Sequence, residues 1–332
     1  MGGTLRIISL SRRALVSIAA ATVVTTLLAP AASAAADCTV EYLPVQNGAD
    51  WSSLRITGVD RWGNVSGFYS PNRDDHTLAR WTADGMQIVP RPEGAKKFVT
   101  RAANASGVVA ASVDRTDGTT VAMTHSPGAG YRELPTPAGY QVWGVEDIND
   151  RGDVLGRVQP AGTSSWGGLV VWHADGHAPD IIELPGINGI ALGEDGTVLV
   201  DSWDGASLWR GGALAKKLPD LGSSVDPRAL TRDGVIFSSP YGEDVGSWLW
   251  TESTGVVERF SGNGVVEAAN QDGRSVGYLK DGNYTAVVWQ GTTLVGALPL
   301  PQGVTSGSAE AVGESGVIAG IAGTKAARWI CR

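Results

Sequence analysis

The sequence predicts an all-β fold, specifically a seven-bladed β-propeller with four strands in each blade. Three observations lead to this prediction: short alternating apolar segments between turn residues, no long helical periodicity, and a repeat of 38 to 45 residues. Glycine, which punctuates these turns, occurs 45 times in 332 residues. A period of this length is typical of one propeller blade, so seven repeats predict seven blades.

Each repeat is anchored by a glycine, which in four of the seven repeats ends an Asn/Asp-x-x-Gly element, seen most clearly in NDRGDVLG. Asn or Asp begins a type I turn through a side-chain bond to the backbone, and glycine then takes the left-handed position that returns the chain. The element therefore predicts one tight hairpin per blade rather than a catalytic motif. The anchors are Gly63, Gly107, Gly152, Gly196, Gly234, Gly273 and Gly316.

A tryptophan ends the third strand of most repeats, and an apolar residue, usually followed by proline, ends the fourth. Because the tryptophan recurs at a buried-strand register, we expect it to pack between blades rather than to bind a ligand. Six blades are the alternative if one repeat is degenerate, and the fourth repeat has the shortest loops. The tryptophans are Trp81, Trp172, Trp209, Trp250, Trp289 and Trp329, with Met123 in this place in the second repeat.

The last repeat stops at ARWICR without a fourth strand, whereas the segment CTVEYLPV near the start carries the expected Leu43 and Pro44. Pairing this N-terminal strand into the last blade would close the ring and remove exposed strand edges. It would also place Cys38 beside Cys331, the two cysteines of the chain. In an exported protein such a pair favours one disulfide, with two unpaired thiols as the alternative.

Residues 1–34 are expected to be a signal peptide, which leaves 35–332 as a single propeller domain. A basic start precedes an apolar stretch at 14–28, and Ala-Ser-Ala at 32–34 is a small-x-small cleavage signal. An ordinary secretory peptide and a twin-arginine export signal both fit. The apolar stretch is too short to span a bilayer and no later run approaches that length, so we expect no membrane span.

The predicted domain is acidic. Three of the 26 basic residues and none of the 34 acidic residues lie in the signal segment, so the remainder has a formal charge of −11. Nucleic acids select basic patches, so we expect no nucleic-acid partner. The four histidines are not spaced as zinc ligands are, and no cluster of carboxylates has the spacing of a calcium-binding loop. No segment resembles a phosphate-binding loop. We therefore expect no metal and no cofactor. We also expect the protein to be bacterial, secreted and monomeric.

A charged position recurs in the innermost strand of the predicted blades. The following position is small in every repeat except at Asp147, and the next is apolar, as crowding near a propeller axis requires. Packing of an inner strand alone would not favour charged residues at a position next to small and apolar ones. The charged position, six residues before each anchor glycine, holds Thr57, Arg101, Glu146, Ile190, Arg228, Glu267 and Glu310.

We expect these charges at the channel mouth on the face opposite the turns. They could form inter-blade ion pairs that close the channel, or a binding site in which arginines hold carboxylates and glutamates hold hydroxyls or cations. Catalysis by two glutamates, as in glycoside cleavage, is a third interpretation, with Glu146, Glu267 and Glu310 as candidates.

Aromatic residues in the loops between second and third strands could rim the same mouth, either stacking on a ligand or filling gaps between blade tips. Trp51 and Trp143 lie on segments that enter the innermost strand. The loop candidates for ligand binding are Trp166, Trp203, Tyr241 and Tyr284.

The repeat resembles that of the HAF-repeat family of secreted bacterial proteins, whose pattern runs roughly Ala-x-x-Ile-Asn-x-x-Gly-x-Val-x-Gly before an aromatic-rich strand ending in Trp. VEDINDRGDVLG with GLVVW fits it, as does VEAANQDGRSVG with TAVVW, and the resemblance covers residues 38–332. The His-Ala-Phe triplet that names the family is absent. The resemblance implies an extracellular, propeller-like protein and no established activity.

The sequence thus favours a secreted, non-catalytic module that binds an extracellular glycan or a protein partner. A carbohydrate-active hydrolase or lyase using the channel glutamates is one alternative. A structural scaffold of the cell envelope, suggested by repetition and export, is another.

Overall fold

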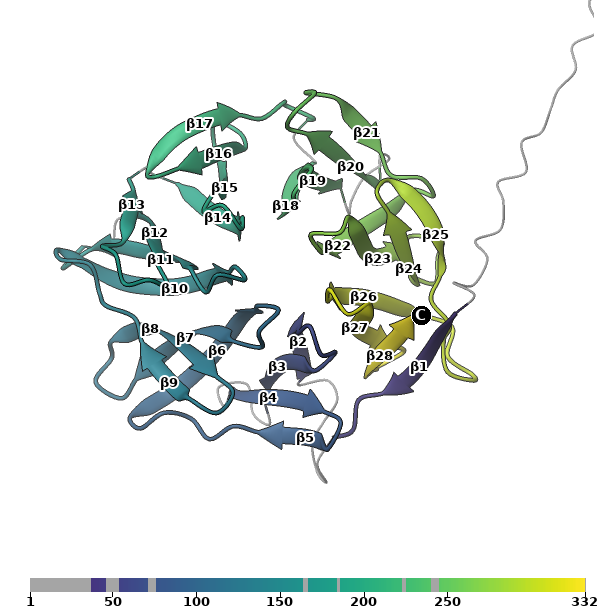
Figure 1. Ribbon diagram of the computed structural model, residues 1–332, viewed down its shortest axis with the longest axis horizontal. Coiled ribbons are helices and arrows are strands. Elements are labelled where there is room, and N and C mark those ends of the chain that lie inside the picture. The colour runs from purple at the N-terminus through teal and green to yellow at the C-terminus, as the bar shows by residue number, and fades with distance from the viewer. Residues whose placement is uncertain are drawn as a thin grey trace, which may run out of the picture. The chain divides into compact units, whose positions relative to one another are not determined.

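The computed structural model describes residues 37–45, 54–70, 76–163, 167–183, 186–222, 225–239 and 245–331. The signal peptide expected at 1–34 lies outside the described residues, as do Trp51, Trp166 and Tyr241. The described residues form seven four-stranded antiparallel sheets, arranged as the blades of a ring (Figure 1). The prediction of seven blades is confirmed, and the alternative of six is wrong because the fourth repeat forms a complete sheet.

Each blade runs outward from the channel in chain order. Blade 1 comprises β2 (Leu54–Val59), β3 (Val65–Tyr69), β4 (Thr77–Thr82) and β5 (Gly85–Ile88). Blade 2 comprises β6 (Ala95–Ala103), β7 (Val109–Arg115), β8 (Thr120–Ser126) and β9 (Gly130–Glu133). Blade 3 comprises β10 (Tyr140–Ile148), β11 (Val154–Pro160), β12 (Gly168–Trp172) and β13 (Asp180–Ile182). Blade 4 comprises β14 (Ile187–Leu192), β15 (Val198–Ser202), β16 (Ser207–Arg210) and β17 (Ala213–Lys217).

The remaining blades follow the same order except at the last strand. Blade 5 comprises β18 (Asp226–Leu230), β19 (Gly234–Ser239), β20 (Gly246–Thr251) and β21 (Val257–Arg259). Blade 6 comprises β22 (Gly264–Ala269), β23 (Arg274–Leu279), β24 (Thr285–Gln290) and β25 (Thr293–Ala297). Blade 7 comprises β26 (Gly307–Val312), β27 (Val317–Ala322), β28 (Lys325–Cys331) and, as its outer strand, β1 (Cys38–Tyr42).

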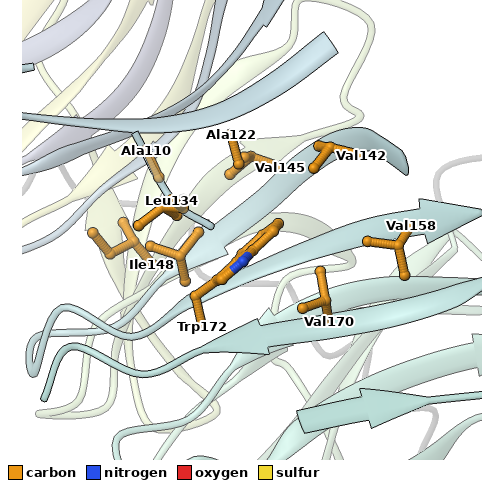
Figure 2. Packing of buried hydrophobic residues seen from close by; sticks show 10 residues of the cluster. Ala110, Ala122, Leu134, Val142, Val145, Ile148, Val158, Val170 and Trp172 are labelled. Atoms are coloured by element: carbon orange, nitrogen blue, oxygen red, sulfur yellow. The ribbon is translucent and has the colours of Figure 1, made fainter. Parts of the chain in front are cut away.

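In six of the seven blades the third-strand tryptophan packs against the preceding blade, as predicted, and Met123 takes its place in blade 2. Trp172 is buried among residues of blades 2 and 3, including Ala122 and Leu134 (Figure 2). Its indole N–H donates to the carbonyl of Pro135, at 2.7 Å, in the segment that leaves blade 2. Trp329 makes the same bond to Pro299 at 2.7 Å. The proline after the fourth strand therefore supplies the acceptor in these blades, and the carbonyl of Ser261 does so for Trp289 at 2.9 Å. Trp209 instead donates to the hydroxyl of Ser207 in its own blade at 3.0 Å.

The N-terminal strand closes the ring as predicted. β1 pairs antiparallel with β28, in a register that places Cys38 opposite Cys331, and the two cysteines form a disulfide. Beyond β1, the carbonyl of Pro44 accepts the indole N–H of Trp81 in blade 1 at 2.8 Å. The same short segment thus completes blade 7 and packs against blade 1.

The Asn/Asp-x-x-Gly elements form the predicted turns and also join blades. Asn149 accepts the backbone N–H of Asp153 at 2.9 Å through its side-chain oxygen, and Gly152 has φ of +89°, where glycine is favoured. The Asn149 amide then donates to the carbonyl of Gly193 in the next blade at 3.1 Å. Asn104 bonds the carbonyl of Asn149 in the same way at 3.0 Å. The turn residue is therefore also an inter-blade contact.

Candidate functional site

A β-bulge interrupts the innermost strand of every blade at one equivalent position. In blade 3 the register with β11 shifts between Val145 and Asp147, which leaves Glu146 as the extra residue. A bulge leaves one residue unpaired, bends the strand and redirects a side chain. The same shift occurs once in each blade, and its extra residues are Thr57, Arg101, Glu146, Ile190, Arg228, Glu267 and Glu310. These are the seven positions that the sequence repeat singles out.

The bulges bring most of these side chains to one cavity of about 330 Å³, here called the central cavity. Small residues beside the bulges, such as Ala191 and Ala268, also line it and leave the space that the charged side chains use. The cavity extends to Glu194 and Gln271 in the turns, so it lies on the turn side of the charges rather than at the opposite face that we expected. The bulge residues that line it are Thr57, Arg101, Glu146, Ile190, Arg228 and Glu267.

The two glutamates of blades 6 and 7 are incompletely neutralised. Glu267 is accessible within the channel, but the surrounding protein removes part of its hydration and raises its pKa, while the charge of Arg228 opposes the rise. Loss of hydration also raises the pKa of Glu310; Arg55 opposes this effect and the charge of Glu267 adds to it. Each carboxyl therefore holds a proton more readily than an ordinary glutamate.

Glu146 has an ion-pair partner, because the guanidinium of Arg157 on β11 lies 2.6 Å from its carboxylate. Arg101, in contrast, is exposed and makes no ion pair or hydrogen bond within the described part of the chain. The charges thus neither form a complete set of ion pairs nor stand entirely unpaired. Arg157 and Arg55 were missed in the sequence because neither occupies the repeated position.

A second cavity of about 260 Å³, here called the side groove, runs between blades 2 and 3 and shares Arg101 and Glu146 with the central cavity. β6 and β10 each have nine residues, longer than the inner strands of the other blades. The groove is lined by Val99, Arg101, Ser112, Asp114, Trp143, Gly144, Glu146 and Arg157.

A second bulge in β10 places Trp143 at this groove. The register with β11 shifts between Val142 and Gly144, which leaves Trp143 as the extra residue. Its side chain is 46% exposed, and the guanidinium carbon of Arg157 lies 5.8 Å from its ring centroid. Two bulges three residues apart thus direct an indole and a carboxylate to the same groove.

Asp147, the exception among the small positions, joins two blades. Its carboxylate accepts the backbone N–H of Ile148 at 2.8 Å and that of Leu192 in blade 4 at 2.7 Å. Burial raises its pKa to about 7; these two hydrogen bonds oppose the shift, and the charges of Glu194 and Glu146 add to it. The residue holds a strand-to-strand contact at the edge of the site.

Trp203 and Tyr284, the predicted loop aromatics that can be placed, line neither of these two cavities. Trp203 is 92% exposed and borders a separate cleft of about 480 Å³ with Asp201 and Asp226. Tyr284 packs beside Tyr278, with ring centroids 5.3 Å apart. Loop length, which the repeat does not set, decides where such residues lie.

Within the described ranges, no group of three or more His, Cys, Asp or Glu side chains could hold a metal ion. The same part of the chain contains no helix long and apolar enough to cross a membrane.

No protein-family model and no curated protein matches the chain. Among solved structures, a streptogramin B lyase matches with TM-score 0.59 and 14% identity, covering 90% of this chain and 100% of that one. YCF48 bound to a D1 peptide matches with TM-score 0.57 and 12% identity, covering 89% and 96%. The propeller domain of the Trilobed protease from Pyrococcus furiosus matches with TM-score 0.54 and 11% identity, covering 85% and 94%. These similarities show the fold alone.

Proposed function

We propose that this protein is a secreted, non-catalytic propeller that binds a carbohydrate in the side groove and the central cavity. The observation that carries the proposal is the pair of bulges in β10, which direct Trp143 and Glu146 to a groove shared with Arg101. Bulges of this kind are frequent beside functional sites, where they re-aim side chains.

The chemistry of the groove suits a sugar ring. A pyranose presents an apolar C–H face and a rim of hydroxyls, so it needs an aromatic surface beside polar groups. Trp143 supplies a half-exposed indole, Glu146 and Asp114 supply acceptors, and the guanidinium groups supply donors. All of these line one groove whose volume of about 260 Å³ suits one or two sugar rings.

The ion pair between Glu146 and Arg157 supports binding at this position. The guanidinium of Arg157 lies 2.6 Å from the carboxylate of Glu146, so an acceptor group and a donor group stand side by side in the groove. Such a pair can accept from one sugar hydroxyl and donate to the next.

A glycan array followed by calorimetric titration of the best glycan tests the proposal. We expect Trp143→Ala to weaken binding at least tenfold, because stacking on an indole is lost. Trp203→Ala is the matched control, since Trp203 is exposed at a different cleft. Thermal unfolding of both variants checks that the fold is intact. Equal affinity of wild type and Trp143→Ala, or no bound glycan at all, would contradict the proposal.

The raised pKa values of Glu267 and Glu310 favour one alternative, a hydrolase or lyase acting on carbohydrate. A carboxyl that keeps its proton can act as a general acid, and its partner as a base or nucleophile. Release of new reducing ends from a glycan panel, abolished in Glu267→Gln and in Glu310→Gln, would establish this activity. Binding without turnover would favour the module.

Export is supported by the disulfide, which persists in oxidising compartments. Fractionation of the producing cells separates two possibilities: a secreted module is found free in the medium, and a cell-envelope scaffold stays with the cells. Size-exclusion chromatography of the purified protein tests the expected monomer.

A further inference from the structure

We infer that the ligand of the side groove carries a carboxylate, and that Arg101 binds it. This inference rests on the proposed function and adds to it the chemical class of the glycan, an acidic sugar. It begins from the position of Arg101, which is the bulge residue of β6 and borders both cavities.

Arg101 differs from the other arginines around the channel in what its guanidinium contacts. Arg157 forms an ion pair with Glu146 at 2.6 Å, and Arg228 lies 3.7 Å from Asp226 and also acts on the charge of Glu267. Arg101 has no partner among the described residues, although its side chain is exposed to the cavities. Its donors are therefore available to a ligand.

The acidic residues of the groove, Glu146 and Asp114, do not form an ion pair with Arg101. Glu146 is neutralised by Arg157, and Asp114 accepts the hydroxyl of Thr120 at 2.9 Å rather than a guanidinium. A ligand carboxylate placed beside Arg101 would thus meet a positive charge that no described side chain within ion-pair distance offsets.

The shape of the guanidinium favours a carboxylate. Its planar fork of N–H donors matches the two oxygens of a carboxylate, and such bidentate pairs are stronger and more directional than contacts of a lysine ammonium. A carboxylate attached to a sugar ring would then lie beside a hydroxylated ring resting on Trp143, which lines the same groove.

The experiment uses two probes that differ only in the charged group: an oligosaccharide of uronic acids, and the same oligosaccharide with its carboxylates reduced to hydroxymethyl groups. We expect the wild-type protein to bind the acidic probe roughly 10- to 100-fold more tightly, the range of one charge-assisted hydrogen-bonded pair. Raising the salt concentration should weaken binding of the acidic probe more than of the reduced one.

Arg101→Gln should remove this preference, so that the acidic and the reduced probe bind this variant with similar affinity. Arg101→Lys should restore it only in part, because the ammonium lacks the fork. Arg132→Gln is the matched control, since Arg132 is an exposed arginine on β9, the outer strand of the same blade. Thermal unfolding confirms that each variant folds.

The outcomes separate the two proposals. If the wild-type protein binds neither probe nor any other glycan, the proposed function fails. If it binds both probes equally, prefers a sulfated glycan, or keeps its preference in Arg101→Gln, carbohydrate binding stands and the assignment of a carboxylate to Arg101 is wrong.

Discussion

Replacing Asp147 with asparagine should change how the stability of the propeller depends on pH. Asp147 is partly buried between blades 3 and 4, and its pKa is raised from an ordinary 3.8 to about 7. Its folded-state pKa is thus above its unfolded value, so the fold favours the protonated carboxyl. The stabilising contribution is fully present below about pH 4 and is lost as pH rises towards 7.

The magnitude follows from the two pKa values. They differ by roughly three pH units, and each unit corresponds to about 1.4 kcal/mol. The ionisation of Asp147 should therefore reduce the free energy of unfolding by about 4 kcal/mol as the pH rises from 4 to 7. The asparagine of the variant would not titrate, although its amide can accept only one of the two N–H groups that Asp147 accepts. Losing that bond costs about 1–3 kcal/mol at every pH.

The assay is guanidinium unfolding of wild type and Asp147→Asn at half-unit steps from pH 4.5 to 8, followed by tryptophan fluorescence. We expect the variant to be the less stable protein at low pH and to gain on wild type as pH rises, approaching or exceeding it above pH 7. Asp84→Asn, a change in an exposed hairpin turn, is the control. A stability difference between wild type and Asp147→Asn that stays constant over this range would refute the reasoning.

Three further changes test the closure and the inter-blade contacts. Cys38→Ser should lower the free energy of unfolding by about 5 kcal/mol, because the disulfide closes a loop spanning 293 residues; a reduced wild-type sample should match it in chemical denaturation. Trp172→Phe should cost about 1–3 kcal/mol in the same assay, since the Pro135 carbonyl loses its buried donor. Asn149→Ala should cost about 2–4 kcal/mol, because both its turn bond and its link to the next blade are lost; an unchanged midpoint in thermal unfolding would contradict this role.

The blades could be predicted because each anchor glycine fixes the register of the strand before it. That register is also why Arg101 and Glu146 could be singled out together from positions 45 residues apart. The bulges themselves could not be predicted, since a bulge depends on how the paired strands twist around the axis and not on any residue type at that position.

The side groove could not be predicted from the sequence for a related reason. Arg157 reaches Glu146 only because the bulges shift β10 against β11, and the repeat alone contains no information on this offset. Trp143 was noted only as a residue entering the strand, and its second bulge has no counterpart in the repeat. Trp203 and Tyr284 were predicted to bind a ligand because they are aromatic residues in loops. In the structure Trp203 borders a separate cleft and Tyr284 packs beside Tyr278.

The bond between the first and last strands gives the polypeptide a closed covalent path. A protease that cuts one loop between Cys38 and Cys331 opens this path at one point but releases no fragment, because both pieces stay joined through the sulfur atoms. The nicked chain would keep all seven sheets and run as one species on a gel until it is reduced. A single cleavage would then be a survivable event, and two cuts would be needed to detach a segment.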